Sequence, residues 1–154
     1  MRTIVFYIIF IFSISCQANP EPELNVIDKS GNVYTYSIEE LQSLPQKEVI
    51  TVLPWFEGDN TFSGFLLTDL LKKNKITMPE MVTILALNDY KVTISKSDII
   101  KYEPIIALKM SGEYMNVKNK GPFWLIFSLS DFKEIDTLEY HAKMIWQIKE
   151  IYLN

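Results

Sequence analysis

The sequence predicts a single α+β domain in which most strands are antiparallel. Short apolar runs, several with two-residue alternation, recur about eight times, and about three short helices with capping residues lie between them. Most connections between the apolar runs are too short to contain a crossover helix, and short connections join antiparallel neighbours. The sequence shows no internal repeat and no low-complexity segment. Strands mixed with short helices therefore indicate the α+β class.

The first 18 residues have the pattern of a secretory signal peptide. Arg2 is followed by an apolar run from Ile4 to Phe12 and then by small or polar residues. A membrane-spanning helix needs about 20 apolar residues, so this run is too short to be one. Two processing routes compete. Cleavage after Ala18 suits the small residues at Cys16 and Ala18, whereas lipid attachment at Cys16 would need a Leu that residues 13–15 lack, so we favour a soluble exported protein.

Residues 19–154 form the predicted mature domain. Of 154 residues, 18 belong to the signal peptide, which leaves 136, enough for one domain with a real core. Cys16 is the only cysteine, so no thiolate remains to bind a metal or attack a substrate. The formal net charge is −4, with acids and bases interleaved, and there is no basic stripe of the kind that nucleic acid requires.

Local signals place the elements in order. After a Pro- and Glu-rich lead-in, two alternating runs flank a turn at residues 30–32 and predict a β-hairpin. Ser37 and Glu40 have the capping-box spacing and predict a helix that Pro45 ends. Further strands are predicted at 48–53, 81–87, 90–94, 105–110, 114–117, 122–128 and 145–153, and further helices at 67–73, at 98–101 after a cap at Ser95 or Ser97, and at 138–143.

The stretch from residue 51 to residue 71 is predicted to be an aromatic loop that leads into an amphipathic helix. Trp55 follows Pro54, which ends the preceding strand, and a turn-forming run follows Phe56, so the Trp55 ring lies where the chain changes direction. Such a ring either covers the core or stacks on a flat ligand. Before any family resemblance is considered, both interpretations stay open.

Three stretches in this order and spacing resemble the molybdopterin-binding domain of the sulfite oxidase type. The first is FSGFLLTDLL; the second is ALNDYKVTI followed by IIALKMSGE; the third is GPFWLIF with the distal MIWQIKEI. Together they cover nearly all of the mature chain. The resemblance implies a sulfite-oxidase-type fold with a pocket for a pterin.

Two departures from that family bear on function. Its enzymes hold molybdenum through a cysteine in the loop that corresponds to residues 51–56, which here reads TVLPWF. They also carry a lysine before the Trp of the last strand, where this chain has Ile145 before Trp146. Four lysines remain nearby in sequence, so phosphate binding is weakened and not excluded: Lys109, Lys118, Lys120 and Lys143.

The pattern resembles a smaller branch of exported, non-enzymatic proteins of the periplasm that bind a reduced pterin without molybdenum. The resemblance implies that such proteins relay pterin availability to the periplasmic domain of an inner-membrane signalling enzyme, either a cyclic-di-GMP synthase/phosphodiesterase or a histidine kinase. The alternative is a molybdopterin-dependent oxidoreductase of the same fold with a metal ligand other than cysteine. A third possibility is an exported interaction module whose pocket is filled by its own side chains.

We expect six residues to contact the pterin. Trp55 would stack on it, and Tyr90 would wall the pocket or hydrogen-bond the ligand. Asp89 would read the pyrimidine edge, because such a site rejects analogues that leave polar groups unpaired. Lys109 either points to solvent or faces the pocket. The remaining candidates are Gly121 and Trp146.

Other chemistry finds no support in the sequence. His141 is the only histidine, and one histidine builds neither a metal site nor a catalytic triad, so we expect it at the surface. The sequence contains no Gly-x-Ser-x-Gly motif and no phosphate-binding loop. No metal ligand set is predicted.

Overall fold

The computed structural model describes residues 21–154. The predicted signal peptide, with Cys16, lies outside the described residues. Within them the chain forms ten strands, four α-helices and two short 3₁₀-helices, which confirms the α+β class. In the same residues no helix is both long and apolar enough to cross a membrane.

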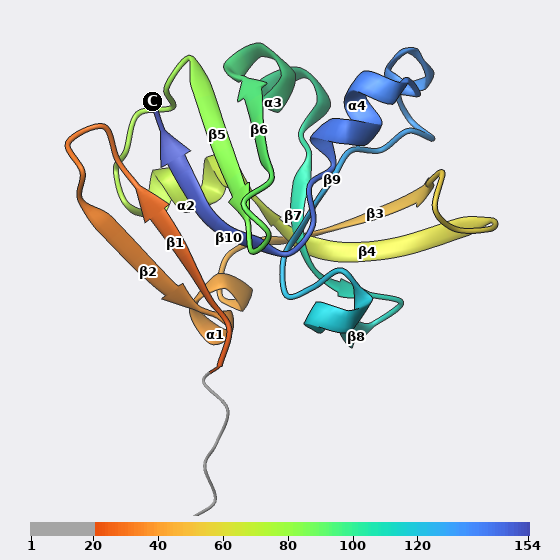
Figure 1. Ribbon diagram of the computed structural model, residues 1–154, viewed down its shortest axis with the longest axis horizontal. Coiled ribbons are helices and arrows are strands. Elements are labelled where there is room, and N and C mark those ends of the chain that lie inside the picture. Colours follow the sequence, from red (N-terminus) through yellow and green to blue (C-terminus); the bar gives the residue numbers. More distant parts are fainter. Residues whose placement is uncertain (1–20) are drawn as a thin grey trace, which may run out of the picture.

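One sheet places the first and the last strand of the described chain side by side (Figure 1). Its order is β2-β1-β10-β5-β6. The strand β10 is parallel to β1, and every other pairing in this sheet is antiparallel. The bounds are β1 (Glu23–Ile27), β2 (Val33–Ser37), β5 (Met81–Ala86), β6 (Lys91–Ser95) and β10 (Ile148–Leu153).

The second sheet is wholly antiparallel. Its path is β3-β4-β7-β8, and β9 also pairs with β7. The bounds are β3 (Gln46–Val52), β4 (Asp59–Leu66), β7 (Ile105–Met110), β8 (Glu113–Tyr114) and β9 (Trp124–Ile126). Side chains from both sheets join one contiguous core, in which the largest fully buried residues are aromatic: Phe62, Phe65, Phe123, Trp124 and Phe127.

Two helices begin after residues that the sequence predicts as caps. Ser37 and Glu40 form the predicted capping box, and Ser95, not Ser97, accepts the amide hydrogen of Asp98. These bonds satisfy amide groups that the first turn of a helix leaves unpaired. The bounds are α1 (Ile38–Gln42), α2 (Leu67–Lys73), α3 (Lys96–Tyr102) and α4 (Leu138–Lys143), with 3₁₀-turns η1 (Val117–Asn119) and η2 (Lys133–Ile135).

The structure corrects the prediction of a long loop before α2. Residues 59–66 form β4, an eight-residue strand paired with both β3 and β7. Glycine and polar residues concealed its alternation in the sequence. Gly64 lies so close to β7 that an added Cβ would stand 2.0 Å from the Ile106 carbonyl oxygen. Only the short segment between Val52 and Asp59 remains as the loop that carries Trp55.

Three other predicted strands are shorter than expected. The run at 114–117 contributes only its first residue to β8 and then passes into η1. The run at 122–128 pairs only over Trp124–Ile126, and the last strand starts at Ile148 because Gln147 adopts a positive φ of 54°. Such a φ interrupts extended pairing.

Candidate ligand pocket

A pocket of about 310 Å³ opens beside the loop between β3 and β4. We call it the Trp55 pocket. The β5–β6 turn, α4 and the segment that enters β10 supply its other walls. Its lining contains no lysine, arginine, aspartate or glutamate and consists of Trp55, Ala86, Asn88, Tyr90, His141, Ala142, Met144, Ile145 and Trp146.

All three tryptophans of the chain meet at this pocket. The Trp55 ring lies 5.3 Å from Trp146 and 5.8 Å from Trp124, measured between ring centroids, and the last two are 6.0 Å apart. Trp124 is fully buried and its indole nitrogen donates to the Met144 carbonyl, so it is a core residue. Trp55 and Trp146 are only partly buried, so they form the open face of this cluster.

Lys120 places a positive charge against the tryptophan cluster without entering the pocket lining. Its ammonium lies 3.5 Å from the Trp146 centroid and 5.5 Å from the Trp55 centroid. Burial lowers the pKa of this lysine from its ordinary value. The cation contributes a favourable contact with the indole rings, about 0.5–2 kcal/mol.

The β5–β6 turn presents Asn88 and Tyr90 to the pocket. The Asn88 side-chain oxygen accepts the Tyr90 amide hydrogen at 3.2 Å, and the Tyr90 hydroxyl donates to the Ala142 carbonyl at 3.2 Å. Asp89 has φ of +65° at the turn between them and is absent from the lining. The turn is therefore tied to the end of α4.

The α4 segment supplies His141 to the wall. Its Nε2 lies 2.7 Å from a carboxylate oxygen of Asp136, and its side chain keeps 18% of its surface exposed. The imidazole packs edge-on against Trp55, with 6.3 Å between centroids. His141 is therefore part of the pocket wall and not the surface residue that the sequence suggested.

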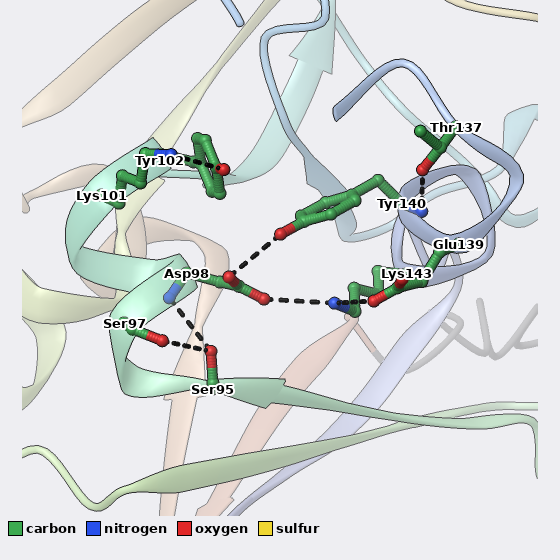
Figure 2. Close-up of polar contacts among 9 residues, drawn as sticks. All are labelled: Ser95, Ser97, Asp98, Lys101, Tyr102, Thr137, Glu139, Tyr140 and Lys143. Atoms are coloured by element: carbon green, nitrogen blue, oxygen red, sulfur yellow. Dashed lines mark hydrogen bonds and ion pairs between the residues drawn. The ribbon is translucent and has the colours of Figure 1, made fainter. Parts of the chain in front are cut away.

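A polar cluster fixes α4 against α3 (Figure 2). Asp98 accepts hydrogen bonds from the Tyr140 hydroxyl at 3.0 Å and from the Lys143 ammonium at 3.1 Å. Lys143 also pairs with Glu139 at 2.7 Å. The side chains of Asp98 and Lys143 are 18% and 17% exposed, so this pair is largely shielded from water. We call this cluster the Asp98 brace.

The structure brings together some of the six predicted contact residues and separates others. Trp55, Tyr90 and Trp146 line the Trp55 pocket. Asp89, Lys109 and Gly121 do not.

The contacts of Lys109 and Gly121 explain why these two residues do not line the pocket. The Lys109 ammonium lies 4.4 Å from the Tyr114 centroid, on the β7–β8 hairpin. Gly121 is buried, and a Cβ there would lie 2.3 Å from the Met115 backbone, so this glycine serves close packing.

Asn88 and His141 line the pocket and were not predicted. Asn88 is the neighbour of the predicted Asp89, and only the direction of the turn decides which of the two faces inward. His141 is far from Trp55 in sequence, and nothing in its own neighbours signalled a pocket. Among the described residues no group of three histidine, cysteine, aspartate or glutamate side chains could hold a metal ion.

No known protein family matches the sequence, and no curated protein matches it either. The structure is similar in fold to that of the sulfane dehydrogenase SoxCD from Paracoccus pantotrophus, with a TM-score of 0.62 and 11% sequence identity. The similarity covers 86% of this chain and 38% of that one, so the chain spans well under half of its neighbour. At this identity the match shows the fold alone, and that fold is of the sulfite oxidase type.

Proposed function

We propose that this chain is a non-enzymatic protein of the periplasm that binds a reduced pterin without molybdenum. In this proposal it relays the presence of the pterin to the periplasmic domain of an inner-membrane signalling enzyme, such as a cyclic-di-GMP synthase/phosphodiesterase or a histidine kinase. The observation that carries the ligand part is the Trp55 pocket, which is small, aromatic and free of charged lysine, arginine or carboxylate side chains.

The size and chemistry of the pocket favour a small, flat, uncharged ring system. Ligand pockets measure about 300–1,000 Å³, and this one is at the lower end. Aromatic rings stack on or pack against indoles in offset or edge-on geometries, which Trp55 and Trp146 provide on one side. Asn88, Tyr90 and His141 add the few polar groups that orient a ligand.

The complete molybdenum cofactor does not fit these residues. Molybdenum in this fold requires a soft sulfur ligand, and the loop at residues 51–56 offers leucine, proline and aromatic side chains instead. The cofactor's phosphate requires a cation, and the lining of the Trp55 pocket contains none of the lysines. The donor set therefore suits a free pterin better than a metal-bearing cofactor.

Support for export and for the signalling partner comes from the sequence. The apolar run from Ile4 to Phe12 supports export, and the relay rests on the resemblance to the smaller, cysteine-less branch of the family. The relay is tested by calorimetric titration of the pterin-loaded and the empty protein into the purified periplasmic domain of such a signalling enzyme. Binding that depends on the pterin is expected, and equal heats for both forms would contradict it.

The ligand part is tested on protein purified from the periplasm after expression with its own first 18 residues. The protein is denatured, and the supernatant is assayed for pterin fluorescence after oxidation and for molybdenum by elemental analysis. We expect stoichiometric pterin without metal. Molybdenum in stoichiometric amount would instead favour the oxidoreductase. If the protein contains neither pterin nor molybdenum and does not bind added reduced pterins, the interaction module is favoured.

The substitution Trp55→Ala tests the pocket directly. It removes the stacking surface, so we expect pterin affinity to fall about 30-fold or more, while the free energy of unfolding falls by only about 1–3 kcal/mol because the ring is partly exposed. Calorimetry and urea unfolding measure the two effects. Phe56→Ala is the matched control, since Phe56 is the next residue of the same loop and lies outside the lining. Equal losses of affinity in both variants would contradict the proposal.

A further inference from the structure

His141 combines a free ring nitrogen with a fixed position in the pocket wall. Its Nε2 is bonded to Asp136, whereas its Nδ1 has no hydrogen-bond partner in residues 21–154. Every fully buried side-chain nitrogen or oxygen in those residues has a partner, so Nδ1 keeps accessible surface. His141 itself belongs to the lining of the Trp55 pocket.

Asp136 determines which hydrogen-bonding role Nδ1 has. An ionised carboxylate only accepts hydrogen bonds, so Nε2, at 2.7 Å from it, carries the hydrogen. In the neutral imidazole Nδ1 is then an acceptor with its lone pair directed away from Asp136. The carboxylate thus fixes the tautomer and the ring orientation together, as outer partners do for functional histidines.

Two other polar side chains of the lining, Asn88 and Tyr90, each already make one hydrogen bond within the protein. The Asn88 oxygen accepts from the Tyr90 amide, and the Tyr90 hydroxyl donates to Ala142. Amide and indole nitrogens only donate, so among the side-chain nitrogens of this lining Nδ1 of His141 is the acceptor.

The backbone that carries His141 is held rigidly. The His141 amide donates to the Thr137 carbonyl at 2.9 Å, and the Thr137 hydroxyl caps α4. The Asp98 brace ties Tyr140 and Lys143, on either side of His141, to α3 (Figure 2). A ring on such a support loses little freedom when a ligand binds, which favours selective recognition.

We propose that His141, positioned by Asp136, accepts a hydrogen bond from a ring N–H or amino group of the ligand. It thereby selects flat heteroaromatic rings that carry a donor edge over apolar rings of the same shape. This inference rests on the proposed function and assigns the polar selectivity of the same pocket. A pterin meets the requirement, since its pyrimidine edge carries an amino group and a ring N–H.

The test compares two probes, pterin and quinoxaline, which share a flat bicyclic shape and differ in the donor edge. The wild type is expected to bind pterin more tightly. His141→Phe keeps a flat ring and removes the acceptor, so we expect pterin affinity to fall about 10-fold or more and quinoxaline affinity to stay within about twofold. Should that variant fail to fold, as judged by circular dichroism, His141→Met makes the same test.

Two further variants separate positioning from general structure. Asp136→Asn offers an amide that can donate to Nε2 and move the ring hydrogen to Nδ1, so we expect pterin affinity to fall about threefold or more with quinoxaline unaffected. Glu134→Gln is the matched control, since this carboxylate lies in η2, two residues before Asp136, and pairs with Lys101 away from the pocket lining. It should leave both affinities unchanged.

The outcomes distinguish the two proposals. If His141→Phe binds pterin as tightly as the wild type, or loses both probes equally, the selective role of His141 is refuted while pterin binding stands. If Asp136→Asn behaves like Glu134→Gln, the positioning role of Asp136 is refuted. If the wild type binds no pterin, both the proposed function and the proposed role of His141 are refuted.

Discussion

At the scale of single residues, close backbone approach explains why Gly64 is a glycine. A Cβ at this position would lie 2.0 Å from the Ile106 carbonyl oxygen and 2.6 Å from the Ala107 Cα. Both are backbone atoms of β7, which cannot move aside as a flexible side chain can. The pairing of β4 with β7 also shifts register between Ser63 and Gly64, as expected of a bulge that brings two backbones close.

Gly64→Ala should therefore be strongly destabilising. We expect the free energy of unfolding to fall by about 3 kcal/mol or more, because β4 and β7 must separate to admit the methyl group. Urea unfolding measures the change. Gly58→Ala is the comparison: Gly58 has φ of +70° but open space around it, so only about 1 kcal/mol of backbone strain is expected. Similar losses in both variants would contradict the close-approach argument.

At the scale of elements, the Asp98 brace holds α4 in place and with it one wall of the pocket. Burial raises the pKa of the Tyr140 hydroxyl above its ordinary 10.0, and its hydrogen bond to Asp98 raises that pKa further. For Lys143, burial lowers the pKa, but Glu139 and Asp98 outweigh it, so the pKa lies above the ordinary 10.5. Both groups keep their protons to higher pH in the folded state than in the unfolded state.

This proton retention predicts a loss of stability in alkali. Because the folded state binds more protons above pH 10, the free energy of unfolding should be level below that pH and fall as pH rises through the raised pKa values. Asp98→Asn should lower stability by about 1–3 kcal/mol at pH 7 and make the alkaline fall shallower. Urea unfolding between pH 7 and pH 11 tests both. Glu80→Gln, which removes an exposed ion pair with Lys96 outside the brace, serves as the control, and parallel pH curves for wild type and Asp98→Asn would refute the argument.

At the scale of the whole molecule, β10 closes the domain. It lies between β1 and β5, so it joins the hairpin β1–β2 to the hairpin β5–β6 (Figure 1). Its buried side chains, Ile148, Ile151 and Leu153, belong to the shared core. Without this strand the two hairpins of the first sheet have no common neighbour.

Removal of residues 148–154 should therefore abolish cooperative folding. Each of the three buried side chains contributes about 1.5–3 kcal/mol, and their sum approaches the whole stability of a small domain. Thermal unfolding followed by circular dichroism is expected to show no transition. Removal of Asn154 alone, which loses one exposed hydrogen bond to Thr83, should cost under about 1 kcal/mol. A cooperative transition in the longer truncation would contradict this role of β10.

The sequence predicted the parts of the site that depend on local signals. Pro54 and the turn residues after Phe56 placed Trp55 at a bend, and the Asn88–Tyr90 turn was recognised from its own residues. The prediction chose Asp89 as a reader of the ligand, whereas Asn88 lines the pocket and Asp89 does not. Which side chain of a tight turn faces inward depends on the positive φ of Asp89, and the sequence pattern does not specify that angle.

Other parts of the site could not be predicted, because they depend on contacts between distant segments. His141 packs against Trp55 in a position that the Asp98 brace fixes by holding α4 beside α3. The residues next to His141 in the sequence carry no pattern that predicts this contact. The strand β4 was missed for a related reason. Gly64 weakens the strand pattern, and the need for a glycine there is visible only when β7 lies against it.

The sequence by itself determined the α+β class, the capping box of the first helix, the first hairpin and a sulfite-oxidase-type resemblance without its molybdenum-ligating cysteine. These depend on neighbouring residues or on residue identity, which a linear pattern carries. The tertiary structure alone decided that the three tryptophans meet and that β10 lies between two hairpins. It also decided that His141, bonded to Asp136, joins Trp55, Asn88 and Tyr90 in the lining of one pocket. Those features arise from packing between segments far apart in the chain, where burial and close approach, and not local propensity, select the arrangement.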